Sequence, residues 1–225
     1  MNTGSLPDGL RQAIADDLKP LRPLPPAWMR TLYAVAVSAA GLAIVMTVFK
    51  LSLRPDIEQL PVWLSWGCTA LQIVVGVVLM GMALREAVPG SGVPAGAVTL
   101  AVSTGIVMQI LVGIATWMHS PGMALDKGHG LETGMTCCTH DIALALPAFA
   151  ITLWMVSRAL PLRPSTAGLL GGTGAAVAAD AVNHILCPMS DLRHVLVWHT
   201  GMLFGLMLVG WSAGKLWDRR RFGQS

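Results

Sequence analysis

Six long apolar segments dominate this sequence and limit what it can fold into. They cover residues 31–49, 62–84, 94–118, 139–157, 167–186 and 195–216, and Pro and Gly residues occur in the links between them. A helix that crosses a membrane needs about 20 mostly apolar residues, whereas a buried strand has only about 4–8. The segments therefore predict an all-α fold, an integral membrane bundle of six transmembrane helices.

The low charge of the chain supports a membrane protein. Charged residues make up only 12% of the 225 residues, against about 25% in a typical soluble domain. A soluble domain of this size would have too few charged groups to solvate its surface. The composition excludes a disordered chain, an ordinary cytosolic enzyme and a nucleic-acid-binding domain. We therefore expect the chain to contact a lipid bilayer and to have no direct contact with nucleic acid.

The distribution of Lys and Arg along the chain predicts its orientation. With six spans, both termini and the second and fourth loops share one side of the membrane. That side carries eleven basic residues, namely Arg11, Lys19, Arg22, Arg30, Arg85, Arg158, Arg163, Lys215, Arg219, Arg220 and Arg221. The other side carries four, namely Lys50, Arg54, Lys127 and Arg193. This excess predicts two cytoplasmic termini, with an N-terminal arm over residues 1–30, a transmembrane domain over 31–217 and a basic tail over 218–225.

This topology gathers potential metal ligands and thiols near the outer side of the membrane. Cys137, His140 and Asp141 are spaced i, i+3 and i+4, and Asp180, His184 and Cys187 are spaced i, i+4 and i+7, so each set shares one helix face. Thiolates favour Cu(I) and Zn, and imidazole favours zinc or copper. Three interpretations remain open at this stage. They are a transient copper-like or zinc-like ion, a redox-responsive thiol pair, and a structural disulfide between Cys187 and either Cys137 or Cys138.

The N-terminal arm carries one apolar stripe. Leu6, Leu10, Ile14 and Leu18 recur every four residues, which predicts an amphipathic helix over residues 7–18. A Pro-rich stretch over residues 20–26 ends this helix and forms a stiff spacer. A helix this short is marginal in water and needs a surface to lie on. We expect a partner protein to bind this stripe, together with Leu21.

Several stretches of the sequence resemble one known family. They are residues 9–26 (GLRQAIADDLKPLRPLPP), Thr136-Cys137-Cys138, residues 158–164 (RALPLRP), residues 184–188 (HILCP) and Val197-Trp198-His199. Together they look like the NrsF family, the negative regulators of sigma F. The resemblance implies a six-span anti-sigma factor of the bacterial inner membrane. It also implies an arm that holds an extracytoplasmic-function sigma factor, and two outward-facing cysteines that sense oxidants or heavy metals.

Within this resemblance the sensing thiols are Cys187 and one of Cys137 and Cys138, of which Cys137 is favoured. The chain is then a regulator and not an enzyme, with no required cofactor. The alternative is a membrane thiol-disulfide oxidoreductase or a haem- or quinone-linked oxidoreductase. The first lacks a CxxC motif, the usual arrangement for a reactive thiol. The second needs facing histidines in the middle of the membrane, whereas these histidines lie near its edge.

Overall fold

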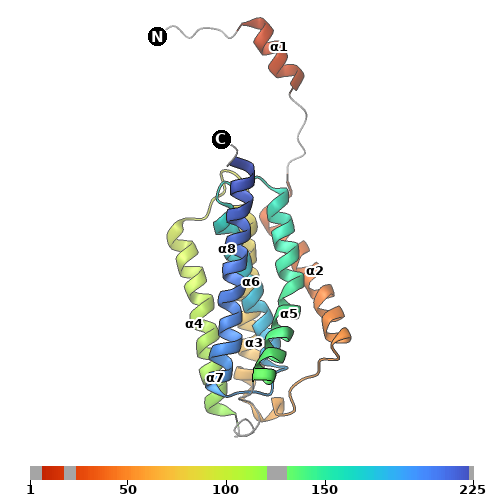
Figure 1. Cartoon of the computed structure of the whole chain (residues 1–225), viewed down its shortest axis with the longest axis vertical. Helices are drawn as coiled ribbons and strands as arrows, with labels where there is room; N and C mark the ends of the chain where they lie inside the picture. The colour runs from red at the N-terminus through yellow and green to blue at the C-terminus, as the bar shows by residue number, and fades with distance from the viewer. Residues whose placement is uncertain (1–6, 18–23, 121–130, 223–225) are drawn as a thin grey trace.

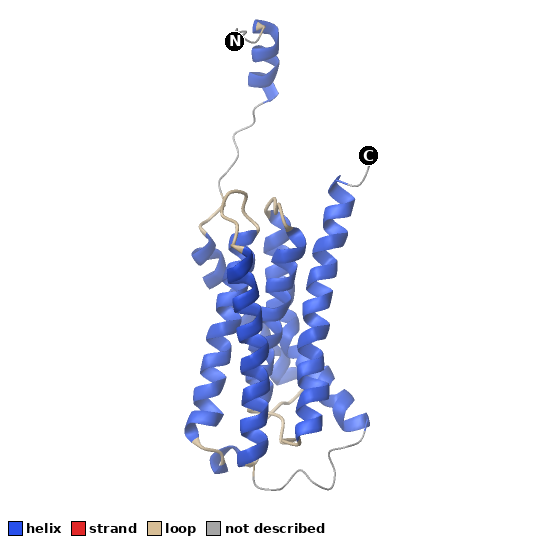
Figure 2. Cartoon of the chain, turned by 90° about the vertical axis from the view of Figure 1, so that its left-hand side faces the viewer, coloured by secondary structure: helices blue, strands red, loops and turns tan. Residues whose placement is uncertain are grey.

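The computed structural model describes residues 7–17, 24–120 and 131–222, and within these ranges it contains helices and no strands. Figures 1 and 2 show long helices running side by side in one bundle. The helices are α1 (Asp8–Asp17), α2 (Ala27–Val48), α3 (Cys68–Glu86), α4 (Ala95–His119), α5 (Leu131–Arg158), α6 (Pro164–His184), α7 (Leu192–His194) and α8 (Thr200–Phe222). Shorter helical turns are η1 (Ile57–Gln59), η2 (Trp63–Gly67) and η3 (Val195–His199).

Among the described residues, five helices are long and apolar enough to cross a membrane. They cover Ala27–Val48, Trp63–Glu86, Ala95–His119, Leu131–Arg158 and Leu192–Arg220. The all-helical, membrane-type fold expected from the sequence is therefore present. The helix α6 is not among the five, so six spans and cytoplasmic termini stay predictions.

The helix α6 has a different composition because it lies at the centre of the bundle (Figure 1). It packs against α3, α5 and α8, and most of its side chains are buried. Small side chains suit a helix that is enclosed by other helices, because they let the neighbouring helix backbones approach closely.

The Gly168 and Gly172 pair of α6 packs closely against α8. A Cβ atom on Gly168 would collide with the backbone of Gly210 in α8, and one on Gly172 would collide with the carbonyl of Leu206. On the opposite side, a Cβ atom on Gly174 would meet the Gly76 carbonyl oxygen of α3 at 2.7 Å. Two neighbouring helices thus reach the backbone of α6 directly.

Several helices begin earlier than the sequence predicts, and two of these starts bear on the site. The fourth segment was expected to begin at residue 139, but α5 begins at Leu131, so Cys137 and Cys138 lie on the helix itself. The sixth segment was expected to begin at residue 195, but a continuous helical path runs from Leu192 through η3 into α8. The apolar pattern did not predict this start because it is interrupted there by the polar residues Asp191, Arg193 and His194.

The predicted arm helix is present as α1 over Asp8–Asp17, where Asp17 is the last described residue of this segment. Leu10 is exposed on this helix, as an unpartnered apolar stripe requires. Leu6, Leu18 and Leu21 lie outside the described residues.

Candidate functional site

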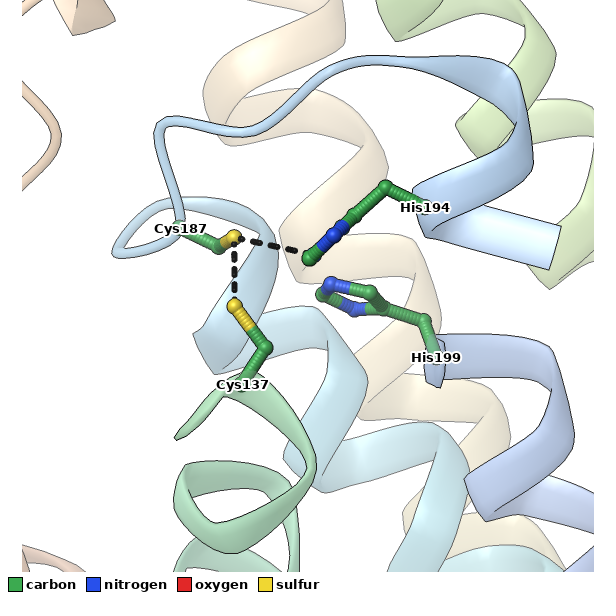
Figure 3. A group of neighbouring side chains, drawn as sticks. All are labelled: Cys137, Cys187, His194 and His199. Atoms are coloured by element: carbon green, nitrogen blue, oxygen red, sulfur yellow. Dashed lines mark hydrogen bonds between the residues drawn. The ribbon is translucent and has the colours of Figure 1, made fainter. Parts of the chain in front are cut away.

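Three chain segments meet at the end of the bundle opposite the C-terminal end of α8. They are the first turns of α5, the link over residues 185–191 that follows α6, and the helical path from α7 into η3 (Figure 1). Figure 3 shows the side chains that they bring together, Cys137, Cys187, His194 and His199. We call these four residues the thiol-imidazole cluster.

The two thiols of the cluster are in contact. The Sγ atoms of Cys137 and Cys187 lie 3.2 Å apart, and both residues are buried. Both are free thiols here, since a disulfide bond is only about 2.05 Å long. The hydrogen bond between the thiols and the burial of the side chain raise the pKa of the Cys187 thiol.

A π-helical turn aligns the two histidines. In η3 the Thr200 N–H donates to the Val195 carbonyl five residues earlier, instead of the usual four. This wider turn lets residues five apart face the same side, and the rings of His194 and His199 lie 5.4 Å apart. The Asp191 carboxylate caps the start of the segment by accepting hydrogen bonds from the N–H groups of Arg193 and His194.

His199 connects the cluster to two buried carboxylates. Its Nδ1 lies 2.9 Å from Asp180 Oδ1 and 3.6 Å from Asp141 Oδ2. The Gln72 side chain of α3 donates to Asp180 Oδ2 at 3.0 Å. Asp141 and Asp180 are both buried between helices. The burial cost of Asp180 is offset by hydrogen bonds with the imidazole of His199 and the amide of Gln72.

The other predicted site residues lie apart from the cluster. Cys138 is half-buried on α5 and is not among the clustered residues. His140 packs its ring edge to face with Phe49 at 5.9 Å. His184 lies between the hydroxyl of Thr116 at 3.5 Å and the carbonyl of Leu64 at 3.3 Å. His194 and His199 were not among the site residues expected from the sequence, and the structure adds them.

A buried ion pair holds the link that carries Cys187. The guanidinium of Arg54 binds the carboxylate of Asp56 and also donates to Ser190 Oγ at 2.8 Å. The Arg54 backbone N–H donates to the Ile185 carbonyl at 3.0 Å. Ile185 and Ser190 lie on either side of Cys187, so this contact, which we call the Arg54 clasp, fixes the link at both ends.

Comparison with known proteins identifies the family. A family model described as negative regulator of sigma F, NrsF, matches residues 14–219. The chain belongs to the NrsF family. The comparisons with curated proteins and with solved structures gave no match.

Membership of the NrsF family confirms the resemblance seen in the sequence and implies a sigma factor as the partner. The match begins at residue 14 and therefore includes Ile14 and the second half of α1. It also includes every residue of the thiol-imidazole cluster. The cluster is thus a feature of the family-matching region of the chain.

In this NrsF chain a groove of about 520 Å³ reaches the thiols from outside the bundle. It lies between the end of α2, the first turns of α5 and the link after α6. Cys137 and Cys187 line it together with polar residues that include Lys50, Glu132, Thr136 and His140. A small polar oxidant or a hydrated metal ion can approach the thiol pair through such a groove, although both thiols are buried.

Proposed function

We propose that this chain is a membrane-bound anti-sigma factor with an outward-facing thiol sensor. At rest its N-terminal arm, residues 1–30, holds an extracytoplasmic-function sigma factor on the cytoplasmic side of the bacterial inner membrane. An oxidant or a heavy metal reacts at Cys137 and Cys187, and the sigma factor is released. The observation that carries this proposal is the 3.2 Å separation of the two Sγ atoms, because one signal can then engage both thiols.

The orientation of the chain follows from its basic residues. The eleven-to-four distribution of Lys and Arg favours six spans, with the thiol-imidazole cluster on the outer side and both termini in the cytoplasm. In an oxidising outer compartment two adjacent thiols can be oxidised to a disulfide that cytosolic reductants do not reverse, which suits a redox sensor. In this arrangement residues 31–217 form the transmembrane domain and residues 218–225 form a basic cytoplasmic tail.

The helices offer a direct route from the thiols to the arm. Cys137 lies on α5, whose other end contacts α2, since the Arg30 guanidinium donates to the Met155 carbonyl at 3.0 Å. Arg30 also donates to the Leu84 carbonyl of α3 at 3.1 Å. The arm enters the bundle at the start of α2, three residues before Arg30. A shift of α5 at the thiol end therefore reaches the point where the arm is attached.

The signal must favour the released state by its own binding or bond energy. A coupling of about 1–3 kcal/mol changes the affinity for the sigma factor by about 5-fold to 150-fold. That range suits a regulator, and it requires only a modest rearrangement of α5 against the link after α6.

The arm is the proposed docking site because Leu10, the one residue of its stripe whose side chain the structure describes, is exposed. Leu10 is 48% exposed, which is costly for a large apolar side chain in water. An amphipathic helix of this kind is bound when its apolar face enters a groove of a partner.

A co-purification experiment tests the arm. The double variant Leu10→Asp, Ile14→Asp places charges in the proposed apolar contact, so the sigma factor should no longer co-purify with the full chain. The matched control is Gln12→Asp, a charge on the polar side of the same helix, which should retain the sigma factor. Equal recovery with the double variant and the control would reject the arm as the docking site.

A further inference from the structure

We propose that Cys137, Cys187, His194 and His199 form a four-ligand site for one thiophilic metal ion, Zn²⁺ or Cu⁺. The four side chains each offer one ligand atom, and all four atoms lie within 4.8 Å of one another. All four residues are buried. Two thiolates and two imidazoles are the ligands that such ions prefer, and four protein ligands leave no open position for a substrate.

The distances in the cluster are close to those of a tetrahedral site. With Zn–S near 2.3 Å and Zn–N near 2.0–2.1 Å, ideal separations are about 3.8 Å between two sulfurs and about 3.5 Å between sulfur and nitrogen. The two Sγ atoms are 3.2 Å apart, and Cys187 Sγ is 3.8 Å from His194 Nε2. Shifts of about half an ångström in side-chain position would therefore admit the ion.

The surroundings of His199 match those of a metal-bound histidine. Such a histidine usually donates its second ring N–H to a carboxylate, which fixes the tautomer and the ring orientation. His199 Nδ1 lies 2.9 Å from Asp180, and Gln72 holds the other oxygen of that carboxylate. The remaining nitrogen, Nε2, is buried and has no hydrogen-bond partner. This free nitrogen is the ligand atom that we assign to the site.

A second group of potential ligands, Asp141, Asp180 and His199, shares the same histidine. Carboxylate oxygens suit harder ions such as magnesium and manganese, whereas the thiolates favour soft ions. Asp180 is already held by Gln72 and His199. We therefore assign the ion to the thiol-imidazole cluster, and we assign to Asp180 the positioning of His199.

The assignment differs from the ligand set expected from the sequence. His140 and His184 contact other groups, and the π-helical turn brings His194 and His199 into their place. The ligands come from α5, the link after α6 and the segment before α8, so a bound ion would join three segments at one point. The inference that metal binding is the inducing signal rests on the proposed function. The inference that these four residues bind a metal ion does not.

Metal titration of the purified full-length chain, reduced and in detergent, tests the site. Cobalt(II) serves as the spectroscopic probe, followed by competition with Zn²⁺ and, under anaerobic conditions, with Cu⁺. We expect one equivalent of cobalt, with the visible bands of a tetrahedral ion and thiolate charge-transfer absorption, and displacement by at least one of the two ions. A chain that binds no metal, or shows an octahedral spectrum without thiolate bands, would overturn the assignment.

Variants locate the ligands. His199→Gln and His194→Gln should each weaken cobalt binding at least tenfold, and Asp180→Asn about 10–100-fold through the orientation of His199. The matched control His140→Gln, a histidine at the same end of the bundle, should bind as the parent chain does. Equal affinity for the two histidine variants and the control would reject these ligands. Melting curves of each variant without metal show which ones retain the fold.

The two proposals fail in different ways. If the chain binds cobalt through these ligands but the sigma-dependent genes do not respond to zinc or copper, the site stands and its role as the sensor is wrong. If the chain binds no metal but Cys187→Ser abolishes the response to an oxidant, the thiol sensor stands and the metal site is wrong.

Discussion

The Arg54 guanidinium donates two hydrogen bonds to the Asp56 carboxylate, 2.6 Å from Nε to Oδ1 and 2.7 Å from Nη2 to Oδ2. Both side chains are buried, at 2% and 0% exposure. An ion pair removed from water gains little net stability, but losing one member leaves the other as an uncompensated charge. Because Arg54 also binds Ser190 and Ile185, the pair positions the link that carries Cys187.

The first prediction concerns this clasp. Arg54→Ala leaves the buried Asp56 carboxylate without its cation, and the chain should lose about 3–5 kcal/mol of stability. The freed link should also expose Cys187, so that alkylation of this thiol becomes faster in a Cys68→Ser, Cys138→Ser background. The matched control is Arg85→Ala, because Arg85 is exposed at the other end of the bundle. If Arg54→Ala and the control show the same melting temperature and alkylation rate, the clasp does not hold the link.

The second prediction concerns acid. Burial alone would raise the pKa of Asp56, but the hydrogen bonds and the charge of Arg54 outweigh burial and hold the pKa below its usual value. A carboxyl group with a lowered pKa in the fold adds stability above its unfolded pKa of about 3.9, and this is lost as pH falls through the lower, folded value. The melting temperature should therefore fall more steeply below about pH 4 in the parent chain than in Asp56→Asn.

Asp56→Asn itself should be less stable than the parent at pH 7, because the neutral amide pairs weakly with Arg54. If the melting temperatures of the two proteins fall equally steeply with pH in the acid range, Asp56 is not the cause of the loss of stability in acid.

The third prediction concerns the centre of the bundle. Gly172→Val should destabilise the chain by at least about 1–3 kcal/mol, because its Cβ atom collides with the Leu206 carbonyl of α8. Gly205→Ala is the control, since a Cβ atom there meets nothing within 4 Å. Thermal unfolding in detergent compares the two variants. If Gly172→Val has the same melting temperature as Gly205→Ala, then α6 and α8 do not pack this closely.

The sequence was a good guide to the helices and a partial guide to the site. Apolar runs of about 20 residues predict membrane helices because a helix of this length crosses the hydrocarbon core of a bilayer. The Gly168 and Gly172 pair is typical of close packing because small residues let two helix backbones approach each other. The spacing rules within each helix also selected Cys137 and Cys187 as candidate site residues, and both belong to the cluster. These rules assume regular helices, however, and η3 is a π-helical turn, which is why His194 and His199 were left out of the site.

The Arg54 clasp could not be predicted by such rules. Arg54 and Ser190 are 136 positions apart, and a pattern along one helix says nothing about a contact between two links. Arg54 was read as one of four basic residues on the outer side, whereas the structure buries it. The one signal in the sequence was the opposite charge of Arg54 and Asp56, two residues apart in a link that also contains Lys50 and Glu58.

The central claim is that Cys137 and Cys187 receive the signal, and a reporter for the sigma-dependent genes tests it most directly. Cells carrying Cys137→Ser, Cys187→Ser or the control Cys138→Ser are exposed to an oxidant and to zinc or copper, and membrane levels of each protein are compared. Serine keeps the shape of cysteine but cannot form a disulfide and binds soft metals poorly. The account predicts that the reporter stays repressed in Cys137→Ser and Cys187→Ser and is induced in Cys138→Ser. Full induction in Cys187→Ser at a normal protein level would contradict it.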